Sequence, residues 1–255
     1  MNVDRPGRDE VVWDDERLAS PHDQADKSLR VRRMFDAIAP SYELVNSVFS
    51  LGRDRTWRKR AVQLAQVQPG ETVLDIACGT GDFLRAFDRW ADKPAMLAGV
   101  DFSPEMLRRA ANRSSPRTVW CQADGLRLPF SAASFDVVSC GFGVRNLQDL
   151  DAGLVEMYRV LRPGGRAAIL EFTRPANRLV QTTYEFYATR IMPLAATLLS
   201  RDRTGAYRYL PKSVVSFVGP EEMCGRLRAA GFATASATPV ARGVVTIYVA
   251  GKEQE

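Results

Sequence analysis

Residues 73–83 read VLDIACGTGDF, an apolar stretch that runs directly into a glycine turn and then into a helical segment. This order of strand, turn and helix limits the fold more than any other feature of the chain, because it opens a βαβ unit of a parallel sheet. Gly79 and Gly81 allow a tight turn, and Asp101 stands twenty residues beyond Gly81 at the end of the next apolar run. An acidic residue at that place can bind ribose hydroxyls, so the sequence predicts a nucleotide-like ligand at the carboxyl ends of the strands.

The residues around the turn distinguish between two classes of cofactor. A dinucleotide site favours a third small residue near position 84 and a helix N-terminus free for pyrophosphate, but this chain has Leu84 there and Asp82 at the helix start. Asp75 adds a second negative charge, and Asp124 with Gly125 forms another acidic turn, where an adenine ring would lie. We therefore expect a cofactor with positive charge and no phosphate, such as S-adenosylmethionine. The alternative is a plain strand-to-helix turn whose aspartates are solvated caps.

The rest of the chain alternates short apolar runs with helical stretches, which is typical of one α/β domain with a mostly parallel sheet. We expect the last two of seven strands, joined through Arg242-Gly243, to form an antiparallel pair. Residues 1–27 are predicted to be a disordered arm, and residues 28–255 a single domain with two helices in 28–60 and a helical lid in 173–219. The predicted strands are Thr72 to Ala77, Met96 to Asp101, Thr118 to Ala123, Phe135 to Gly141, Arg166 to Phe172, Ala233 to Pro239 and Val244 to Ala250.

The composition excludes several other classes of protein. The longest stretch without a charged residue, Ala229 to Ala241, has 13 residues, too few to span a membrane, and no secretory signal opens the chain, so we expect a cytoplasmic protein. The four cysteines lack metal-ligand spacing and are predicted to be reduced, with no metal site. The single histidine, His22, falls in the predicted arm, which argues against Ser-His-Asp or Cys-His catalysis and against a His-ligated zinc.

Four segments resemble the motifs of class I S-adenosylmethionine-dependent methyltransferases: DIACGTGD at 75–82, GVDFSPEM at 99–106, ADGLRLPF at 123–130 and LRPGG at 161–165. Others resemble the ubiquinone/menaquinone biosynthesis C-methyltransferase family: MFDAIAPSYELVN at 34–46, GFGVRN at 141–146, LEF at 170–172, YEFY at 184–187 and YRYLPKS at 207–213. The resemblance covers about Val31 to Gly251. It implies a Rossmann-like class I methyltransferase fold and methyl transfer to a ring carbon of a polyprenylated hydroquinone. The acceptor would be demethylmenaquinol or the 2-methoxy-6-polyprenyl-1,4-benzoquinol of ubiquinone synthesis.

The resemblance also assigns residues to the cofactor. Two positions depart from the family: Gly125 replaces a common Ala, and Gly141 replaces a Ser that often precedes Phe-Gly-Leu-Arg-Asn. The hydroxyl contact at position 141 is therefore lost. The predicted cofactor-binding residues are Asp75, Gly79, Thr80, Gly81, Asp101, Asp124 and Gly125.

Arg145, Asn146 and Tyr42 are the predicted catalytic residues. A hydroquinone ring carbon becomes nucleophilic when its neighbouring hydroxyl loses a proton, so the site must stabilise a phenolate. Arg145 stays protonated and can donate to that oxygen, while Asn146 can orient the ring. Tyr42, Asp36, Glu171 or a chain of waters can take the proton. The alternative for Arg145 is an ion pair that fixes the loop after the fourth strand.

The predicted lid combines apolar and basic residues, with seven bases against only Glu185 and Asp202. Its apolar residues either line a tunnel for the prenyl tail or pack as a plain helical lid. The bases can rest on anionic headgroups, so we expect peripheral association with the inner face of the cytoplasmic membrane. The tunnel candidates are Tyr184, Phe186, Tyr187, Ile191, Met192, Leu194, Leu198 and Leu199.

The competing interpretation is a methyltransferase for nucleic acid or another small aromatic substrate, prompted by the pI of 9.2 and the arginine-rich lid. Because 30 of the 35 basic residues are Arg, the charge alone gives nucleic-acid binding little support. The Asn/Asp-Pro-Pro-aromatic motif expected of an amino-methylating enzyme is also replaced by GFGVRN at 141–146. We therefore expect no nucleic-acid partner. A non-catalytic cofactor sensor is a third interpretation.

Overall fold

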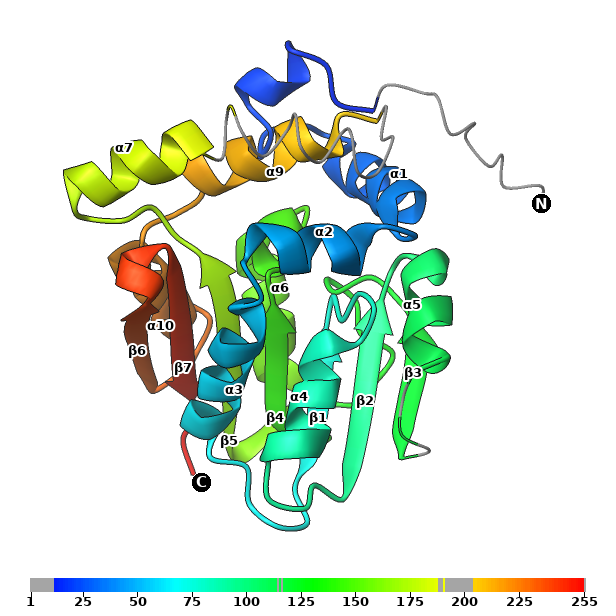
Figure 1. Cartoon of the computed structure of the whole chain (residues 1–255). Helices are drawn as coiled ribbons and strands as arrows, with labels where there is room; N and C mark the ends of the chain where they lie inside the picture. The colour runs from blue at the N-terminus through cyan, green and yellow to red at the C-terminus, as the bar shows by residue number, and fades with distance from the viewer. Residues whose placement is uncertain (1–11, 114, 116, 188–189, 191–203, 255) are drawn as a thin grey trace.

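The computed structural model describes residues 12–113, 115, 117–187, 190 and 204–254. Its centre is one seven-stranded sheet in the order β3-β2-β1-β4-β5-β7-β6 (Figure 1). Strands β1 to β5 run parallel, and β7 is antiparallel to both β5 and β6. The predicted α/β sheet with an antiparallel C-terminal pair is confirmed. The strands are β1 Thr72–Ile76, β2 Met96–Asp101, β3 Thr118–Gln122, β4 Phe135–Gly141, β5 Leu161–Phe172, β6 Thr234–Val240 and β7 Val245–Gly251.

The fifth strand is the one whose boundary differs most from the prediction. It begins at Leu161, which pairs with Phe135, and the pairing then shifts register before it resumes at Arg166 opposite Val137. The intervening Gly164 has φ +73°. The Arg-Pro-Gly-Gly segment therefore belongs to an irregular start of the strand rather than to a separate turn.

Helices cover both faces of the sheet, as a buried parallel sheet requires. Side chains of α6 and α10 join the core on one face, and side chains of α3 and α4 join the core on the other. The central strands are buried on both faces, which explains why their sequences read as continuous apolar runs. The helices of the sheet region are α4 Asp82–Trp90, α5 Pro104–Ala111, α6 Leu150–Val160 and α10 Pro220–Ala229, with a short 3-10 turn η2 at Val144–Asn146.

Three helices precede the sheet, one more than the sequence predicts. They are α1 Lys27–Ile38, α2 Tyr42–Phe49 and α3 Asp54–Ala65. The extra helix, α3, buries a stripe made largely of small residues, together with Arg58. A stripe without large apolar side chains gives a weak periodic signal in the sequence. For that reason the sequence did not predict α3 as a third helix.

The predicted disordered arm is wrong for residues 12–27. The backbone N–H groups of Val12 and Trp13 both donate to Thr204 O at 3.0 Å, and Trp13 is fully buried. A 3-10 turn, η1 Arg17–Ala19, follows and buries Leu18. We call residues 12–28 the N-terminal strap. It was missed because its contacts lie on a helix nearly two hundred residues further along the chain.

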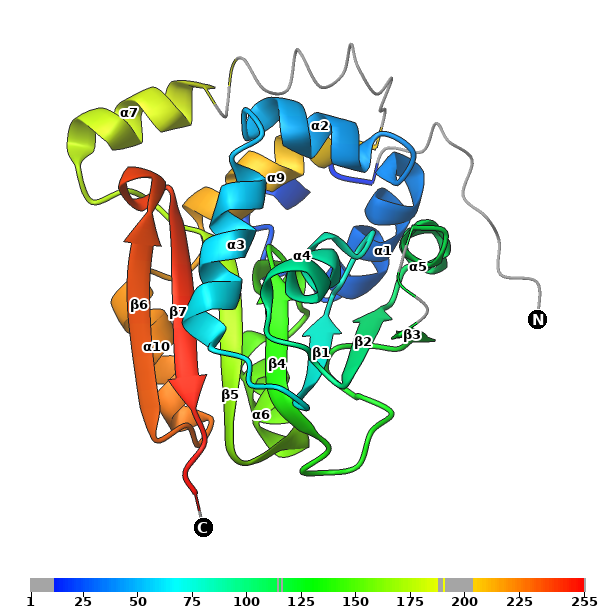
Figure 2. The ribbon, with the colours of Figure 1, turned by 60° about the horizontal axis from the view of Figure 1, so that its bottom comes forward.

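The predicted lid contributes α7 Arg178–Phe186 and α9 Ala206–Val215. Figures 1 and 2 place α2, α7 and α9 together at the carboxyl ends of the parallel strands. Phe186 is 61% exposed, so it lines no interior tunnel, whereas Tyr187 does face a cavity. Among the described residues, no helix is long and apolar enough to cross a membrane. The remaining tunnel candidates, Ile191, Met192, Leu194, Leu198 and Leu199, lie outside the described residues, as does the side chain of Tyr184.

Candidate active site

The glycine turn between β1 and α4 forms the first part of the site. Gly79 and Gly81 have φ values of +54° and +84°, in the left-handed region that favours glycine. A Cβ on Gly81 would stand 2.7 Å from the ring of Trp120, which packs against the turn. Thr80 is 2% exposed, and its Oγ1 has no hydrogen-bond partner in the described part of the chain. Because a buried hydroxyl without a partner costs free energy, this atom fits a polar group of a bound cofactor.

Asp101 lies beside the same turn, at the end of β2. Its Oδ2 accepts from the Gly79 N–H at 2.8 Å, and its Oδ1 accepts from the Ser103 N–H at 2.8 Å. Each carboxylate oxygen can accept a further hydrogen bond, which suits ribose hydroxyls. Burial raises the pKa of Asp101 to about 6, so the carboxylate is charged at neutral pH despite its 5% exposure.

Asp124 and Gly125 meet Asp101 in a small pocket, as predicted for neighbouring strand ends. Leu147 and Asn146 form its other side. A Cβ on Gly125 would stand 3.0 Å from both Ile76 Cγ2 and Leu147 Cδ2. The glycine thus lets these two apolar side chains approach the pocket closely, as a flat, largely apolar ring would require.

The two remaining acidic residues are placed differently. Asp75 is 1% exposed, accepts from Ser139 Oγ at 2.7 Å and lines neither of the two pockets described here. Burial raises the pKa of Asp75 to about 7. Asp82 pairs with Arg85 at 2.6 Å and with Arg58 at 3.6 Å, so two arginines offset the charge that the sequence assigns to cofactor attraction.

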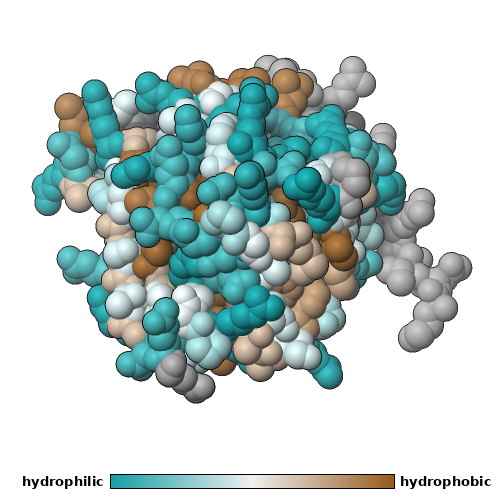
Figure 3. Space-filling view, turned by 90° about the horizontal axis from the view of Figure 1, so that it is seen from below, coloured by the Kyte–Doolittle hydropathy of each residue, from teal (hydrophilic) through white to brown (hydrophobic). Residues whose placement is uncertain are grey.

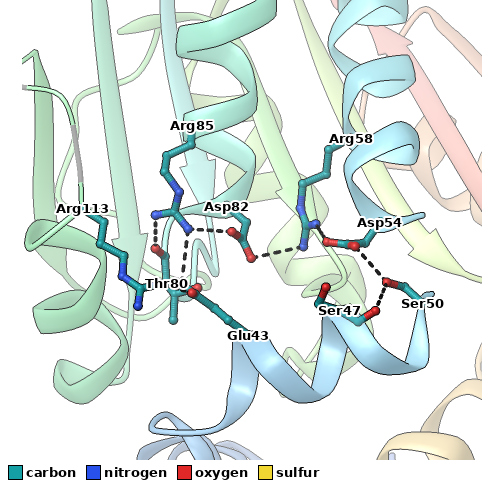
Figure 4. A network of polar contacts seen from close by, with 9 residues as sticks. All are labelled: Glu43, Ser47, Ser50, Asp54, Arg58, Thr80, Asp82, Arg85 and Arg113. Carbon is teal, nitrogen blue, oxygen red and sulfur yellow. Dashed lines mark hydrogen bonds and ion pairs between the residues drawn. The ribbon is translucent and has the colours of Figure 1, made fainter. Parts of the chain in front are cut away.

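These arginines belong to a polar network that joins four segments (Figure 4). Glu43 of α2 pairs with Arg85 of α4 at 3.3 Å and with Arg113, which follows α5. Arg85 Nη1 also donates to Thr80 O at 2.7 Å. Arg58 of α3 bridges Asp82 and Asp54. The network fixes α2 and α3 over the cofactor turn.

A second cavity, of about 250 Å³, lies under α2 and is bounded by α3, α9 and the ends of β5 and β7. Its walls are mainly aromatic and aliphatic, and three arginines provide its positive charge. Trp57 packs edge-on against both Phe142 and Phe172. Such a cavity suits a flat, weakly polar ring that gains negative charge. The aromatic and cationic lining residues are Tyr42, Trp57, Phe142, Phe172, Tyr187, Tyr207, Arg53, Arg58 and Arg145.

Arg145 is the more deeply buried of two buried arginines that line this cavity, with 4% exposure against 7% for Arg58. Its Nη1 contacts Glu171 Oε1 at 2.5 Å and donates to Phe142 O at 2.7 Å, and its Nε donates to Ser213 Oγ at 3.3 Å. Burial acts to lower the pKa of Arg145, but Glu171 together with Tyr209 and Tyr42 outweighs it, so the pKa is raised and the guanidinium stays protonated. The ion pair and the cavity-facing position are both present, so the two alternatives for Arg145 are compatible.

Asn146 lies next to Arg145 in η2 but lines the other pocket, beside Asp101. Tyr209 OH donates to Asn146 Oδ1 at 3.0 Å, and Asn146 Nδ2 donates to Phe142 O at 3.3 Å. Phe142 has φ +60°, a strained value for a non-glycine residue. The carbonyl oxygen of this strained residue, Phe142, accepts hydrogen bonds from both Arg145 and Asn146.

The candidate proton acceptors separate in the structure. Tyr42 lines the cavity, but burial raises the pKa of its phenol, so it remains protonated at neutral pH. Glu171 is fully buried behind Arg145, and Asp36 accepts from Ser103 Oγ at 2.5 Å. Neither carboxylate lines either of the two pockets. Of the three side chains named from the sequence, only Tyr42 reaches the cavity.

The N-terminal strap supports the site. The sequence did not predict this role, because the strap was expected to be part of a disordered arm. Trp13 stacks on Tyr209 at 4.2 Å, and Tyr209 in turn holds Asn146. His22 Nε2 is 2.9 Å from Ser213 O, so the histidine packs on α9 rather than in a free arm. The apolar Val12-Trp13 pair beside a charged stretch was the one available signal.

The strap also reaches the cofactor side of the site. Lys27 is 4% exposed, and its Nζ donates to Leu147 O at 2.5 Å. Burial lowers the pKa of Lys27 to about 8. Ser28 N donates to Gln148 Oε1 at 2.8 Å. The segment after η2 is therefore held from outside by the start of α1.

The fold and the site define a class I S-adenosylmethionine-dependent methyltransferase: a glycine turn after β1, an acidic residue after β2 and a second acidic turn after β3 meet at the switch point of the sheet. The model of the ubiE/COQ5 methyltransferase family matches residues 23–252. The chain belongs to this family, which confirms the resemblance seen in the sequence.

The chain is similar to named members of that family over most of its length. It is 43% identical to a demethylmenaquinone methyltransferase of Deinococcus radiodurans over 215 residues, 83% of this chain and 88% of the relative. It is 39% identical to the ubiquinone/menaquinone biosynthesis C-methyltransferase UbiE of Geobacter sulfurreducens over 236 residues, 89% of this chain and 90% of the relative. The fold matches a SAM-dependent methyltransferase of Thermotoga maritima with a TM-score of 0.64 at 18% identity, covering 88% of this chain and 100% of the other.

Proposed function

We propose that this enzyme methylates a ring carbon of a polyprenylated hydroquinone, converting demethylmenaquinol to menaquinol or acting on the analogous benzoquinol. The observation that carries the proposal is the placement of two consecutive residues of η2. Arg145 lines the aromatic cavity, and Asn146 lines the pocket beside Asp101. A methyl acceptor in the cavity and a cofactor at the glycine turn would therefore meet at η2. The names of the two relatives given above supply the quinol as acceptor.

The chain's own residues would do three things for this reaction. Bound S-adenosylmethionine supplies an electrophilic methyl group. Arg145 donates to the hydroquinone oxygen on which negative charge gathers, from a buried guanidinium that Glu171, Phe142 O and Ser213 hold in place. The aromatic walls hold the ring and exclude water, and the fixed geometry lowers the barrier by placing the two carbons close together. The new C–C bond replaces the S–C bond, and the ring carbon then loses its proton.

The proton that leaves the quinol hydroxyl goes to water in this proposal. Tyr42 stays protonated because burial raises its pKa, and it acts as a hydrogen-bond donor to the ring oxygen or to that water. Glu171 acts through Arg145, since its carboxylate lies on the far side of the guanidinium. Asp36 takes no part, because it bonds to Ser103 outside the cavity.

The test is transfer of labelled methyl to reduced demethylmenaquinone and, separately, to a demethylated benzoquinol, both in detergent. Label in the naphthoquinol alone assigns menaquinone synthesis, and label in both rings assigns a dual role. Arg145→Lys, which keeps the charge facing Glu171, is expected to bind cofactor normally but to lose at least about 100-fold in kcat. Binding of cofactor without label in either ring would refute the acceptor.

The polyprenyl tail implies that the substrate lies in a membrane, so we include peripheral membrane association in the proposed function. The enzyme would take its acceptor from the cytoplasmic leaflet and its cofactor from water. Flotation of the purified enzyme with lipid vesicles tests this, and no flotation at low salt would contradict it.

A further inference from the structure

Helix α2 exposes an apolar face to the outside. Leu44 and Val48, one helical turn apart, are 57% and 43% exposed, and Leu51, in the turn that follows the helix, is 82% exposed. Val45, on the other side of the helix, is 2% exposed and lines the aromatic cavity with Asn46. One short helix therefore has an apolar surface toward the interior and another toward solvent, which a helix at the surface of a globular protein does not need.

Helix α7 carries a second set of exposed apolar residues. Leu179 is 78% exposed and Phe186 is 61% exposed, and Tyr187, the next residue, lines the same cavity. Figures 1 and 2 place α7 and α2 at the same end of the molecule. Figure 3, which views the molecule from the opposite end, shows apolar residues at its upper edge and at its upper left. We call these five side chains the apolar rim: Leu44, Val48, Leu51, Leu179 and Phe186.

The charge around the apolar rim is positive. Five exposed arginines flank it, from the start of α3, the segment before α7 and the β6–β7 link. The nearest acids on α2 and α3 turn inward: Glu43 pairs with Arg85 and Arg113, and Asp54 pairs with Arg58. An apolar strip bordered by bases complements an anionic lipid surface. The flanking arginines are Arg53, Arg55, Arg174, Arg178 and Arg242.

We propose that the apolar rim is the surface by which this enzyme docks on an anionic lipid bilayer, with α2 and α7 lying on the headgroups and the cavity directly beneath α2. The proposal rests on the proposed function, because a lipid-borne acceptor is the reason to commit to a bilayer as the occupant. Residues of α2 line the cavity, as does Tyr187, which directly follows α7, so the rim and the cavity are adjacent. A quinol ring that leaves the leaflet would therefore enter the cavity without crossing open water.

The experiment is flotation with vesicles of phosphatidylglycerol and phosphatidylcholine, compared with phosphatidylcholine alone, at low and high salt. The triple variant Leu44→Ser, Val48→Ser, Leu51→Ser and the double variant Leu179→Ser, Phe186→Ser remove the two halves of the rim. The matched control is Val119→Ser with Val155→Ser, since these side chains are also 56% and 52% exposed but lie on β3 and α6. Each rim variant is expected to reduce the bound fraction at least about fivefold, and the control to leave it unchanged.

Activity toward a short-tailed quinol in lipid-free solution separates the two proposals. The rim variants should retain wild-type turnover there, which also shows that they fold. If wild type turns over no quinol but the rim variants still lose vesicle binding, the proposed function fails and the docking surface stands. Flotation of the rim variants like wild type, or an equal loss in the control, would overturn the docking surface. So would a wild-type dimer that the rim variants dissociate without any vesicle binding, which would make the rim a contact between copies.

Discussion

At position 141, the ring of Phe83 occupies the space that a side chain would need. A Cβ on Gly141 would stand 2.9 Å from Phe83 Cδ1, closer than carbon atoms approach in proteins. The phenylalanine at the start of α4 thus accounts for the glycine at the end of β4, where the family often has Ser. Residues 83 and 141 act as one packing unit beside the cofactor turn.

We predict that Gly141→Ser lowers the free energy of unfolding by about 1–3 kcal/mol, because the added atoms force the buried Phe83 ring to move. Adding Phe83→Leu should restore part of the loss, although Phe83→Leu alone costs about 1 kcal/mol through the space it leaves. Urea unfolding of wild type, the two single variants and the double variant measures the coupling between positions 83 and 141. Additive effects would show that the two residues are independent.

Asp75 provides a prediction about pH. Its pKa rises from an ordinary 3.8 to about 7 through burial, so the folded state binds a proton more readily than the unfolded state. Below about pH 4 both states are protonated and the burial carries no charge penalty, whereas the penalty grows between about pH 4 and about pH 7 and is constant above that. Asp75→Asn keeps an oxygen for Ser139 and removes the charge. It should therefore raise the stability by about 2–4 kcal/mol at pH 8 and by much less at pH 4, as urea unfolding across this range would reveal. A difference in stability between Asp75→Asn and wild type that does not vary with pH would contradict the burial of a charged Asp75.

Among the elements, those with large apolar side chains at regular spacing could be predicted, and those held by distant contacts could not. Each of the seven strands begins and ends within one residue of its expected position, except for the start of β5. Helix α3 was missed because Ala61 and Ala65 carry its buried stripe. The N-terminal strap was missed because its partners, such as Ser213 for His22, are far along the chain. The glycine turn and the acidic residues at the strand ends were predictable from local spacing, whereas the pairing of Asp82 with two arginines was not.

The strap should matter for the reaction as well as for stability. Trp13→Ala removes a fully buried ring that stacks on Tyr209, and is expected to cost about 3–5 kcal/mol of stability. Because Tyr209 holds Asn146, we also expect kcat to fall about tenfold, and Trp13→Phe to restore most of it. Trp90→Ala is the control, since Trp90 packs at the end of α4 away from this stack. Equal losses of kcat in both variants at a temperature where both are folded would mean that the strap has only a structural role.

Across the whole molecule, one end of a single sheet carries both parts of the site. The pocket proposed for the cofactor lies at the ends of β1, β2 and β3, and the cavity proposed for the acceptor lies beside the ends of β5 and β7. These strands belong to one hydrogen-bonded sheet, so a ligand at the glycine turn is linked to the stability of the entire fold rather than of one loop.

We predict that S-adenosylmethionine at 100 times its Kd stabilises the whole chain by about 2.7 kcal/mol, which corresponds to about 5–10 °C in the melting temperature. Thermal unfolding followed by circular dichroism gives the shift, and it should appear as one transition. Asp101→Ala should show a much smaller shift at the same cofactor concentration, because its carboxylate is the predicted ribose partner. A full shift in that variant would mean that Asp101 does not hold the cofactor.

The 3-10 turn that carries Arg145 and Asn146 faces two ligands at once, and this has a consequence for divergence. A substitution in the turn alters the acceptor side and the donor side together, so selection for a new acceptor can hardly act there. The helices α2, α3 and α9 wall the cavity, but none of their described residues lines the pocket beside Asp101. New substrates in descendants of such a chain should therefore arise by changes in these helices, and a designer who wants another aromatic acceptor should diversify them and leave the turn untouched.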